Sequence, residues 1–421
     1  MSPIQKATET YINDLDALRG MIDPLMFMTD TLGKKFNDDH LKALVEHGKE
    51  IETGGPERNF EIPPEHLQKI RHLGRINTQY RIARSLIPRS FLVSFVSTYD
   101  AFLGSLVHAL FQAKPEVLNS SGKQLTYKEL ISFKNIDAAR EHITDSEVES
   151  LLRKSHAEQF DWLEKTFDIK LREGLEVWTN FIELTERRNL FVHSHGKVSA
   201  QYLKVCSENH ANAPGIKIGE ILDAKHEYLV EAYKCLYEIG VKLSQVLWRK
   251  LRPDEIEKAD DALTSITFEL LVIEKYDLAN RLLKFATKLP RHSSDVAKRM
   301  MLINLAQSYK HLGKNEQCLS TLSTTDWSAC RDNFSLCVAV LKDDYDAASQ
   351  LMKRIGQTGM LKQHEYIDWP IFKEFRKTAG FASAYTEIFG MPPSLLLAHN
   401  SAEHDEKNDQ QGDPSPPRNP G

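Results

Sequence analysis

The sequence predicts an all-α protein that contains more than one domain. Apolar residues recur three and four positions apart through most of the chain, which places them on one face of an α-helix. Glycine and proline gather between these stretches, where helices begin and end. The chain has 421 residues, more than one hydrophobic core usually organises. We therefore expect several helical domains in series.

The composition of the chain is typical of a soluble protein. The chain is 41% apolar, and its mean hydropathy of -0.42 is typical of a soluble protein. No apolar run approaches the roughly 18 residues of a membrane span, and no basic segment precedes an apolar one at the N-terminus. The five cysteines form no CxxC pair, which favours free thiols. We expect a cytoplasmic protein without a membrane segment.

The first 62 residues are expected to form an N-terminal helical extension. A helix is predicted near residues 41–51, ending at Gly54-Gly55-Pro56. The helix that follows Pro63 is predicted to break at Pro88, because proline removes a backbone donor.

Residues 63–252 have the pattern of a helical bundle. Apolar residues follow Ser90 with helical spacing, and Asp100 lies among them. A second long helix is expected between Leu171 and Gly196, and a third over about 218–250. Long helices joined by short connections are typical of a bundle.

Residues 253–397 contain three similar segments, 273–283, 311–322 and 341–352. Their first aligned positions are 39 and 30 residues apart, which brackets the tetratricopeptide period of about 34. The aligned residues are Tyr276, Asn315 and Tyr345, each followed three positions later by a small residue, Ala279, Cys318 or Ala348. The segments resemble degenerate tetratricopeptide repeats, and unrelated helical hairpins are the alternative. Residues 398–421 are rich in Pro, Gly, Asp and Asn and predict a disordered tail.

One stretch carries the residue types of an active site. Arg188 stands five residues before His193 near the end of a predicted helix, with Asn189 beside it. RNA carries its own nucleophile, the 2′-hydroxyl. Its cleavage needs a group that titrates near neutrality, such as histidine with a pKa of about 6.5, and a cation beside the phosphate, such as arginine. The net charge of -5 confines any RNA contact to a local patch.

These residues match RNxxxH, the signature of the HEPN superfamily (higher eukaryotes and prokaryotes nucleotide-binding). The sequence resembles that family over about residues 90–250, with Asp100 upstream and Gly196 and Tyr202-Leu203 downstream. The resemblance implies a metal-independent endoribonuclease without a cofactor, which acts on RNA as a homodimer. It implies 2′,3′-cyclic phosphate products, and prokaryotic chains of this kind look like toxins or antiviral defence effectors.

The resemblance implies a role for each residue of the site. His193 would act as general base or acid and Arg188 would stabilise the phosphate, oriented by Asn189 and Asp100. An unpaired carboxylate among apolar neighbours is costly, so Asp100 is expected to pair with Arg188 or Asn189. Weaker candidates for substrate contacts follow from proximity to the motif: Arg187, His195 and Lys197.

Helix geometry bears on how the two main groups meet. Five residues rotate a helix by about 500°, so Arg188 and His193 point roughly 140° apart. A two-fold dimer would bring two motifs to one cleft. The alternatives are a pair of cations that complement the end of a helix dipole, or a non-catalytic interaction or nucleotide-binding protein whose repeats dock a protein partner.

Overall fold

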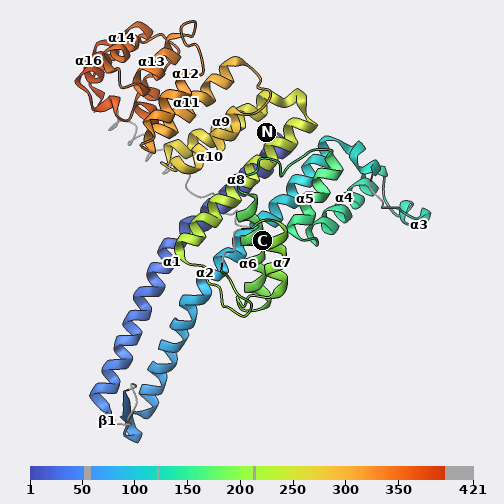
Figure 1. Cartoon of the computed structure of the whole chain (residues 1–421), viewed down its shortest axis with the longest axis vertical. Coiled ribbons are helices and arrows are strands. Elements are labelled where there is room, and N and C mark those ends of the chain that lie inside the picture. Colours follow the sequence, from blue (N-terminus) through green and yellow to red (C-terminus); the bar gives the residue numbers. More distant parts are fainter. Residues whose placement is uncertain (52–57, 121–122, 212–214, 394–421) are drawn as a thin grey trace, which may run out of the picture. The chain divides into compact units, whose positions relative to one another are not determined.

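The computed structural model describes residues 1–51, 58–120, 123–211 and 215–393 (Figure 1). The predicted all-α class is confirmed, because 75% of the structure is helical and only two short strands occur in the described part. The predicted disordered tail, residues 398–421, lies outside the described residues. The chain divides into two compact units, Met1–Ala259 and Asp260–Gly421.

Unit 1 is organised by two long antiparallel helices, α1 (Pro3–His47) and α2 (Pro64–Ala113), which run side by side (Figure 1). The strands β1 (Lys49–Ile51) and β2 (Asn59–Glu61) pair antiparallel where the chain turns between them.

Neither helix ends where the sequence predicted. Residues 41–47 continue α1, and Pro88 is buried inside α2 instead of ending it. An internal proline costs a helix about 3 kcal/mol. Packing along the length of α1 outweighs that cost, so the predicted break at Pro88 is wrong.

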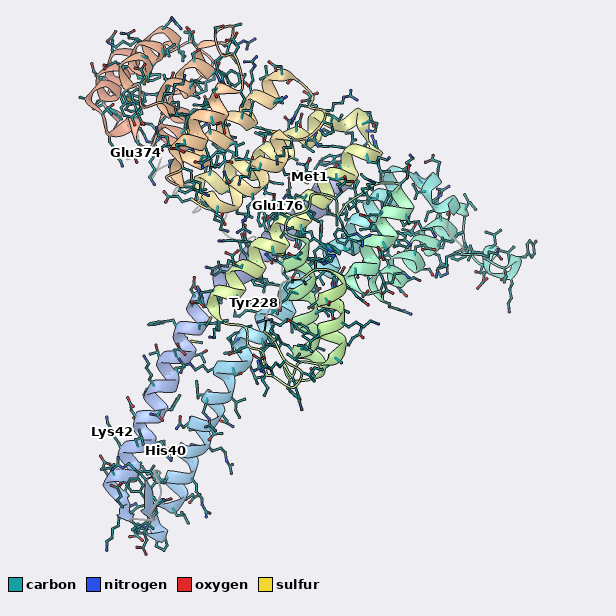
Figure 2. The ribbon with its side chains drawn as sticks, viewed as in Figure 1. Met1, His40, Lys42, Glu176, Tyr228 and Glu374 are labelled. Atoms are coloured by element: carbon teal, nitrogen blue, oxygen red, sulfur yellow. The ribbon has the colours of Figure 1, made fainter. Side chains whose placement is uncertain are left out.

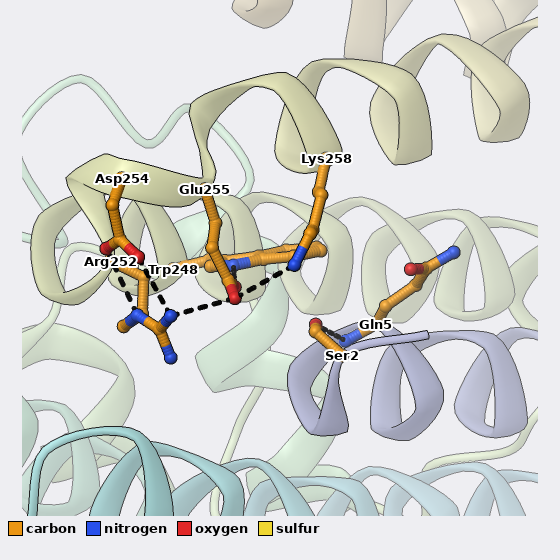
Figure 3. A network of polar contacts seen from close by, with 7 residues as sticks. All are labelled: Ser2, Gln5, Trp248, Arg252, Asp254, Glu255 and Lys258. Carbon is orange, nitrogen blue, oxygen red and sulfur yellow. Dashed lines mark hydrogen bonds and ion pairs between the residues drawn. The ribbon is translucent and has the colours of Figure 1, made fainter.

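The beginning of α1 lies in the core of unit 1. Tyr11 is 2% exposed, stacks on Phe102 of α2 with ring centroids 4.3 Å apart, and donates to the Leu236 carbonyl at 2.7 Å. Leu236 belongs to α8 (His226–Leu251). Ser2 caps α1 by accepting from the Gln5 backbone N–H at 3.1 Å (Figure 3). The first helix therefore supports the helices that carry the motif.

Shorter helices complete unit 1. Two of them, α4 (Ile136–Leu152) and α6 (Trp178–His193), pack against α2. Helix α5 (His156–Phe167) contacts α4 and α6, and α7 (Ala200–Glu208) contacts α6. A small helix, α3 (Tyr127–Leu130), and the 3-10 turn Pro115–Ser120 lie between α2 and α4. The helix expected from about residue 218 begins only at His226, because the backbone of Glu220 and Leu222 bonds to that of Val198 and Gly196.

The end of α8 is tied to the next turn of the chain (Figure 3). Glu255 accepts from the Trp248 indole at 2.9 Å and pairs with Arg252 at 2.9 Å and Lys258 at 3.2 Å. The 3-10 turn Pro253–Glu255 thus leads directly into α9 (Ile256–Val272).

Unit 2 is built of helical hairpins. Short turns separate α9 from α10 (Tyr276–Thr287), α11 (Asp295–His311) from α12 (Asn315–Ser323), and α13 (Asp332–Leu341) from α14 (Tyr345–Ile355). The unit ends with α15 (Gln363–Asp368), the 3-10 turns Pro370–Phe372 and Phe375–Lys377, and α16 (Ala379–Phe389).

The three hairpins share one turn geometry. The residue two positions before each second helix has a left-handed φ of 60°, 71° or 61° in Glu274, Gly313 and Asp343 respectively. The next residue donates to a carbonyl five positions earlier at 2.8 to 3.0 Å in all three turns. The aligned small residues Ala279, Cys318 and Ala348 are at most 1% exposed. The likeness predicted between the segments is therefore present in their backbone.

Helix α2 contains a long apolar stretch. Within the described residues, α2 contains the one window that is long and apolar enough to cross a membrane by length and composition, and 56% of that window is buried inside the protein. Core helices of soluble proteins have the same property, so the absence of a membrane segment stays a prediction.

Candidate functional site

The end of α6 places the motif at the surface of unit 1. The helix ends with His193, and the backbone N–H groups of Ser194 and Gly196 both donate to the Leu190 carbonyl. Gly196 has a φ of 84°, and a Cβ there would lie 2.8 Å from the Leu222 carbonyl oxygen. Only glycine fits this closing turn, as its place after the motif indicated.

A cleft of about 550 Å³ opens beside the motif. Five helices line it: α2, α4, α5, α6 and α7. The polar and charged lining residues are Asp100 of α2, Arg153 and Lys154 after α4, Ser155, His156 and Gln159 around the start of α5, Glu186, Arg188, Asn189, His193 and Ser194 at the end of α6, and Ser199, Gln201 and Tyr202 at the start of α7. The four residues predicted as catalytic therefore share one cavity in a single chain.

Asp100 joins two side chains at the wall of this cleft. Its Oδ2 accepts from Arg188 Nη2 at 2.8 Å, and its Oδ1 accepts from His156 Nε2 at 3.0 Å. The side chains of Arg188 and His156 are 19% and 7% exposed. The predicted pairing of Asp100 with Arg188 is thus present, and it holds the guanidinium in one orientation.

His193 differs from Arg188 in its surroundings, because it is exposed at the last position of α6. Although Arg188 and His193 point about 140° apart on a regular helix, both line the same cleft. Arg188 extends to α2, and the cleft continues around the end of α6 to His193. A second subunit is therefore not required to bring both groups to one cavity.

His156 is one residue of the cleft that the sequence analysis did not predict. It is the first residue of α5, which Ser155 and Glu158 cap reciprocally, and its ring packs edge-on against Phe181 at 5.5 Å. The capping pattern in the sequence predicts where the helix begins. It does not predict that the ring reaches Asp100, which is 56 residues earlier in the chain.

Glu186 is a second unpredicted member of the cleft. Burial raises the pKa of this carboxyl above its ordinary value, although His156 and Arg188 nearby act in the opposite direction. Its Oε1 accepts from Asn189 Nδ2 at 3.2 Å. Asn189, which was expected to help orient His193 and Arg188, therefore donates to Glu186.

Arg187 lies outside this cleft. Its Nε donates to Glu183 at 2.7 Å, and its guanidinium stacks over the Tyr228 ring at 4.1 Å. Glu183 also accepts from the hydroxyls of Tyr202 and Tyr228, each at 2.7 Å. This buried cluster holds Arg187 between α6, α7 and α8. We therefore infer that Arg187 stabilises the packing of α6 against α7 and α8 and does not contact substrate.

His195 and Lys197 do not line the cleft either. Both are exposed, and His195 adopts a left-handed φ of 51°. The His195 carbonyl accepts from Arg89 Nη1 at 3.0 Å, and Lys197 forms a backbone bridge with Ile221. Their backbones shape the turn after α6.

The described part of the chain contains no group of three or more His, Cys, Asp or Glu side chains arranged to hold a metal ion. The cleft instead offers two guanidinium groups, one ammonium group, two imidazoles, two carboxyls and three amides. Comparison of the chain with protein-family models, curated proteins and solved structures finds no match.

Proposed function

We propose that this chain is a metal-independent endoribonuclease of the HEPN type, which cuts RNA by attack of its own 2′-hydroxyl. The observation that carries the proposal is the shared cleft of Arg188 and His193, with the arginine oriented by Asp100. An exposed imidazole and an oriented guanidinium are the two groups that this chemistry needs.

In this reaction His193 accepts a proton and Arg188 stabilises a negative charge. His193 takes the proton of the 2′-hydroxyl, and the oxygen attacks the adjacent phosphorus while the bond to the 5′-oxygen breaks. Arg188 stabilises the negative charge that grows on the phosphate oxygens. The 5′-oxygen takes a proton from an acid, and the products are a 2′,3′-cyclic phosphate and a 5′-hydroxyl end.

Asp100 accepts a hydrogen bond from one nitrogen of the Arg188 guanidinium. It accepts from Nη2, while Arg188 Nε is buried and has no hydrogen-bond partner within the described residues. A buried donor without a partner is costly. A small shift of the guanidinium toward a phosphate in the cleft would supply that partner.

The proposal includes a homodimer with the site at its interface. A second copy facing the cleft would bring a second His193, and one imidazole would then act as base while the other, protonated, acts as acid. The cytoplasmic location and a role as toxin or antiviral effector belong to the same proposal and rest on the resemblance.

The test is cleavage of RNA by the purified full chain in EDTA. We expect cutting to persist in the chelator and His193→Ala to abolish it with an unchanged helical circular dichroism signal. His195→Ala is the matched control, because His195 is exposed two residues away and does not line the cleft. Cutting that survives His193→Ala would contradict the catalytic assignment.

Unit 2 favours one further candidate function. Its three hairpins with equivalent turns form the kind of array that serves as a docking surface for another protein. In this alternative the chain is a non-catalytic interaction or nucleotide-binding protein with tetratricopeptide-like repeats. Binding of RNA or nucleotide without any cleavage would favour it.

A further inference from the structure

Positive charge is concentrated on one half of α2. Residues 64–89 contain six Lys or Arg residues and a single acidic residue, Glu65. Residues 90–113 of the same helix contain no Lys or Arg and one acid, Asp100. In a chain with a net charge of -5, this segment stands out as locally basic.

The basic half of α2 belongs to an arm of unit 1, formed by residues 21–47 of α1 and 64–89 of α2 (Figure 1). Figure 2 shows His40 and Lys42 near the far end of this arm. Within the arm, Arg84 of α2 forms an ion pair with Asp30 of α1 at 2.7 Å. Its charge is therefore partly neutralised.

Three other arginines of the arm are exposed: Arg71, Arg75 and Arg81. No carboxylate of the described residues forms an ion pair with any of them. Arg71 and Arg75 stand four positions apart and share one face of α2. Arg81 lies six residues after Arg75, about 1.7 turns, and points roughly 120° away from it. We name Arg71 and Arg75 the arginine face.

The arginine face leads toward the motif. Further along α2, Arg89 donates to the His195 carbonyl at 3.0 Å, and its guanidinium lies 5.4 Å from the centre of the Phe191 ring. The 18 residues from Arg71 to Arg89 span about 27 Å of helix. A polyanion lying along the face would thus reach the end of α6, where His193 stands at the cleft.

We propose that the arginine face binds the phosphate backbone of RNA and guides the strand to the His193 cleft. This inference rests on the proposed function and adds a docking surface outside the cleft. Arginine suits phosphate because its planar guanidinium donates two parallel hydrogen bonds. Contacts of this kind hold a nucleic acid irrespective of its sequence and weaken as salt rises.

The experiment measures binding without cutting. The full chain carrying His193→Ala is titrated into a fluorescein-labelled 20-nucleotide RNA, and anisotropy is followed at several salt concentrations. Adding Arg71→Glu and Arg75→Glu is expected to weaken binding at least about tenfold and to reduce the salt slope by about two. Arg71→Lys with Arg75→Lys should keep most of the binding.

The matched control is Lys34→Glu with Lys35→Glu. Both lysines are exposed on α1 in the same arm, and the change of charge is identical. We expect this control to change the dissociation constant less than about threefold. Equal weakening by both pairs, or no weakening by the arginine pair, would overturn the inference.

Two further outcomes separate the proposals. Sedimentation of the protein with phosphatidylserine vesicles in the absence of RNA binding would assign the face to membranes and overturn the inference. If the unmodified chain cuts no RNA but the arginine pair weakens RNA binding, the endoribonuclease proposal fails and the arginine face stands.

Discussion

The side chain of Asp100 links α2 to α5 and α6 through two hydrogen bonds. It accepts from Arg188 on one oxygen and from His156 on the other, and its side chain is 29% exposed. Partial burial strengthens both interactions relative to water. The carboxylate therefore supports both the packing of α2 against α5 and α6 and the orientation of the guanidinium.

Replacing Asp100 with Asn should lower stability and activity together. The neutral amide removes the counter-charge of Arg188 and can no longer accept on both sides, so we expect a loss of about 1–3 kcal/mol in the free energy of unfolding. Misplacement of the guanidinium should reduce RNA cleavage about 100-fold.

Urea denaturation and cleavage rates measure these two effects. Asp145→Asn is the control, because Asp145 pairs with His108 at 3.2 Å with side chains 56% and 36% exposed, and such pairs contribute only about 0–1 kcal/mol. Full cleavage by the Asp100 variant would contradict the positioning role.

The raised pKa of Glu186 predicts that the free energy of unfolding depends on pH. Burial raises its pKa above the ordinary value in the folded chain. The unfolded chain therefore releases this proton at a lower pH than the folded chain does, and folding is penalised once the unfolded carboxyl ionises. The stabilising contribution is complete below about pH 4.3 and is lost as pH rises through the folded pKa.

The variant Glu186→Gln removes this titration and keeps an oxygen for Asn189 to donate to. We expect its free energy of unfolding, relative to the unmodified chain, to increase as pH rises above about 4.3 and to level off once the folded carboxyl has ionised. Urea denaturation at several pH values measures the difference. A difference that is constant with pH would show that Glu186 has an ordinary pKa in the folded chain.

At the scale of helices and turns, the features that depend on nearby residues in the sequence were predictable. The turn after α6 depends on Gly196, and the three hairpin turns depend on residues aligned in the sequence. Pro88 shows the opposite case, because its effect on α2 depends on packing against a helix far away in the chain. Propensity gives way to tertiary contacts there.

Gly240 shows how closely α1 approaches α8. A Cβ on Gly240 would lie 2.3 Å from the ring of Tyr11, and that ring is fixed by its stacking on Phe102. Gly240→Ala should therefore lower the free energy of unfolding by about 1–3 kcal/mol, despite the higher helix propensity of alanine.

Thermal or urea denaturation of the full chain tests this prediction. The control is Gly20→Ala in α1, where the added Cβ would meet nothing within 4 Å and should stabilise by up to about 1 kcal/mol. If Gly240→Ala were as harmless as the control, α1 would not be held against α8 as the structure places it.

At the scale of the whole molecule, the candidate site was predictable in part. Arg188, Asn189 and His193 form one local pattern, and the position of Asp100 among apolar residues indicated a buried partner. His156 and Glu186 join the site only through the packing of α5 and α6, which no spacing in the sequence records.

The placement of both main groups in one chain makes the dimer directly testable. Arg188→Ala and His193→Ala chains with different affinity tags are produced together, and mixed dimers are isolated through both tags. Random pairing makes about half of the dimers mixed. If each cleft uses Arg188 of one copy and His193 of the other, mixed dimers should cut RNA while neither variant does so alone.

Inactive mixed dimers would show either that Arg188 and His193 act from the same chain, as their shared cleft allows, or that one site needs the His193 of both copies. A monomer at micromolar concentration in sedimentation would exclude the interface site altogether. Neither result decides whether the chain cuts RNA, because the guanidinium and the imidazole reach one cavity without a second copy. The His193→Ala test decides that question. Dimerisation then bears on which proton donor serves the leaving oxygen, since a lone His193 must return the proton that it has taken.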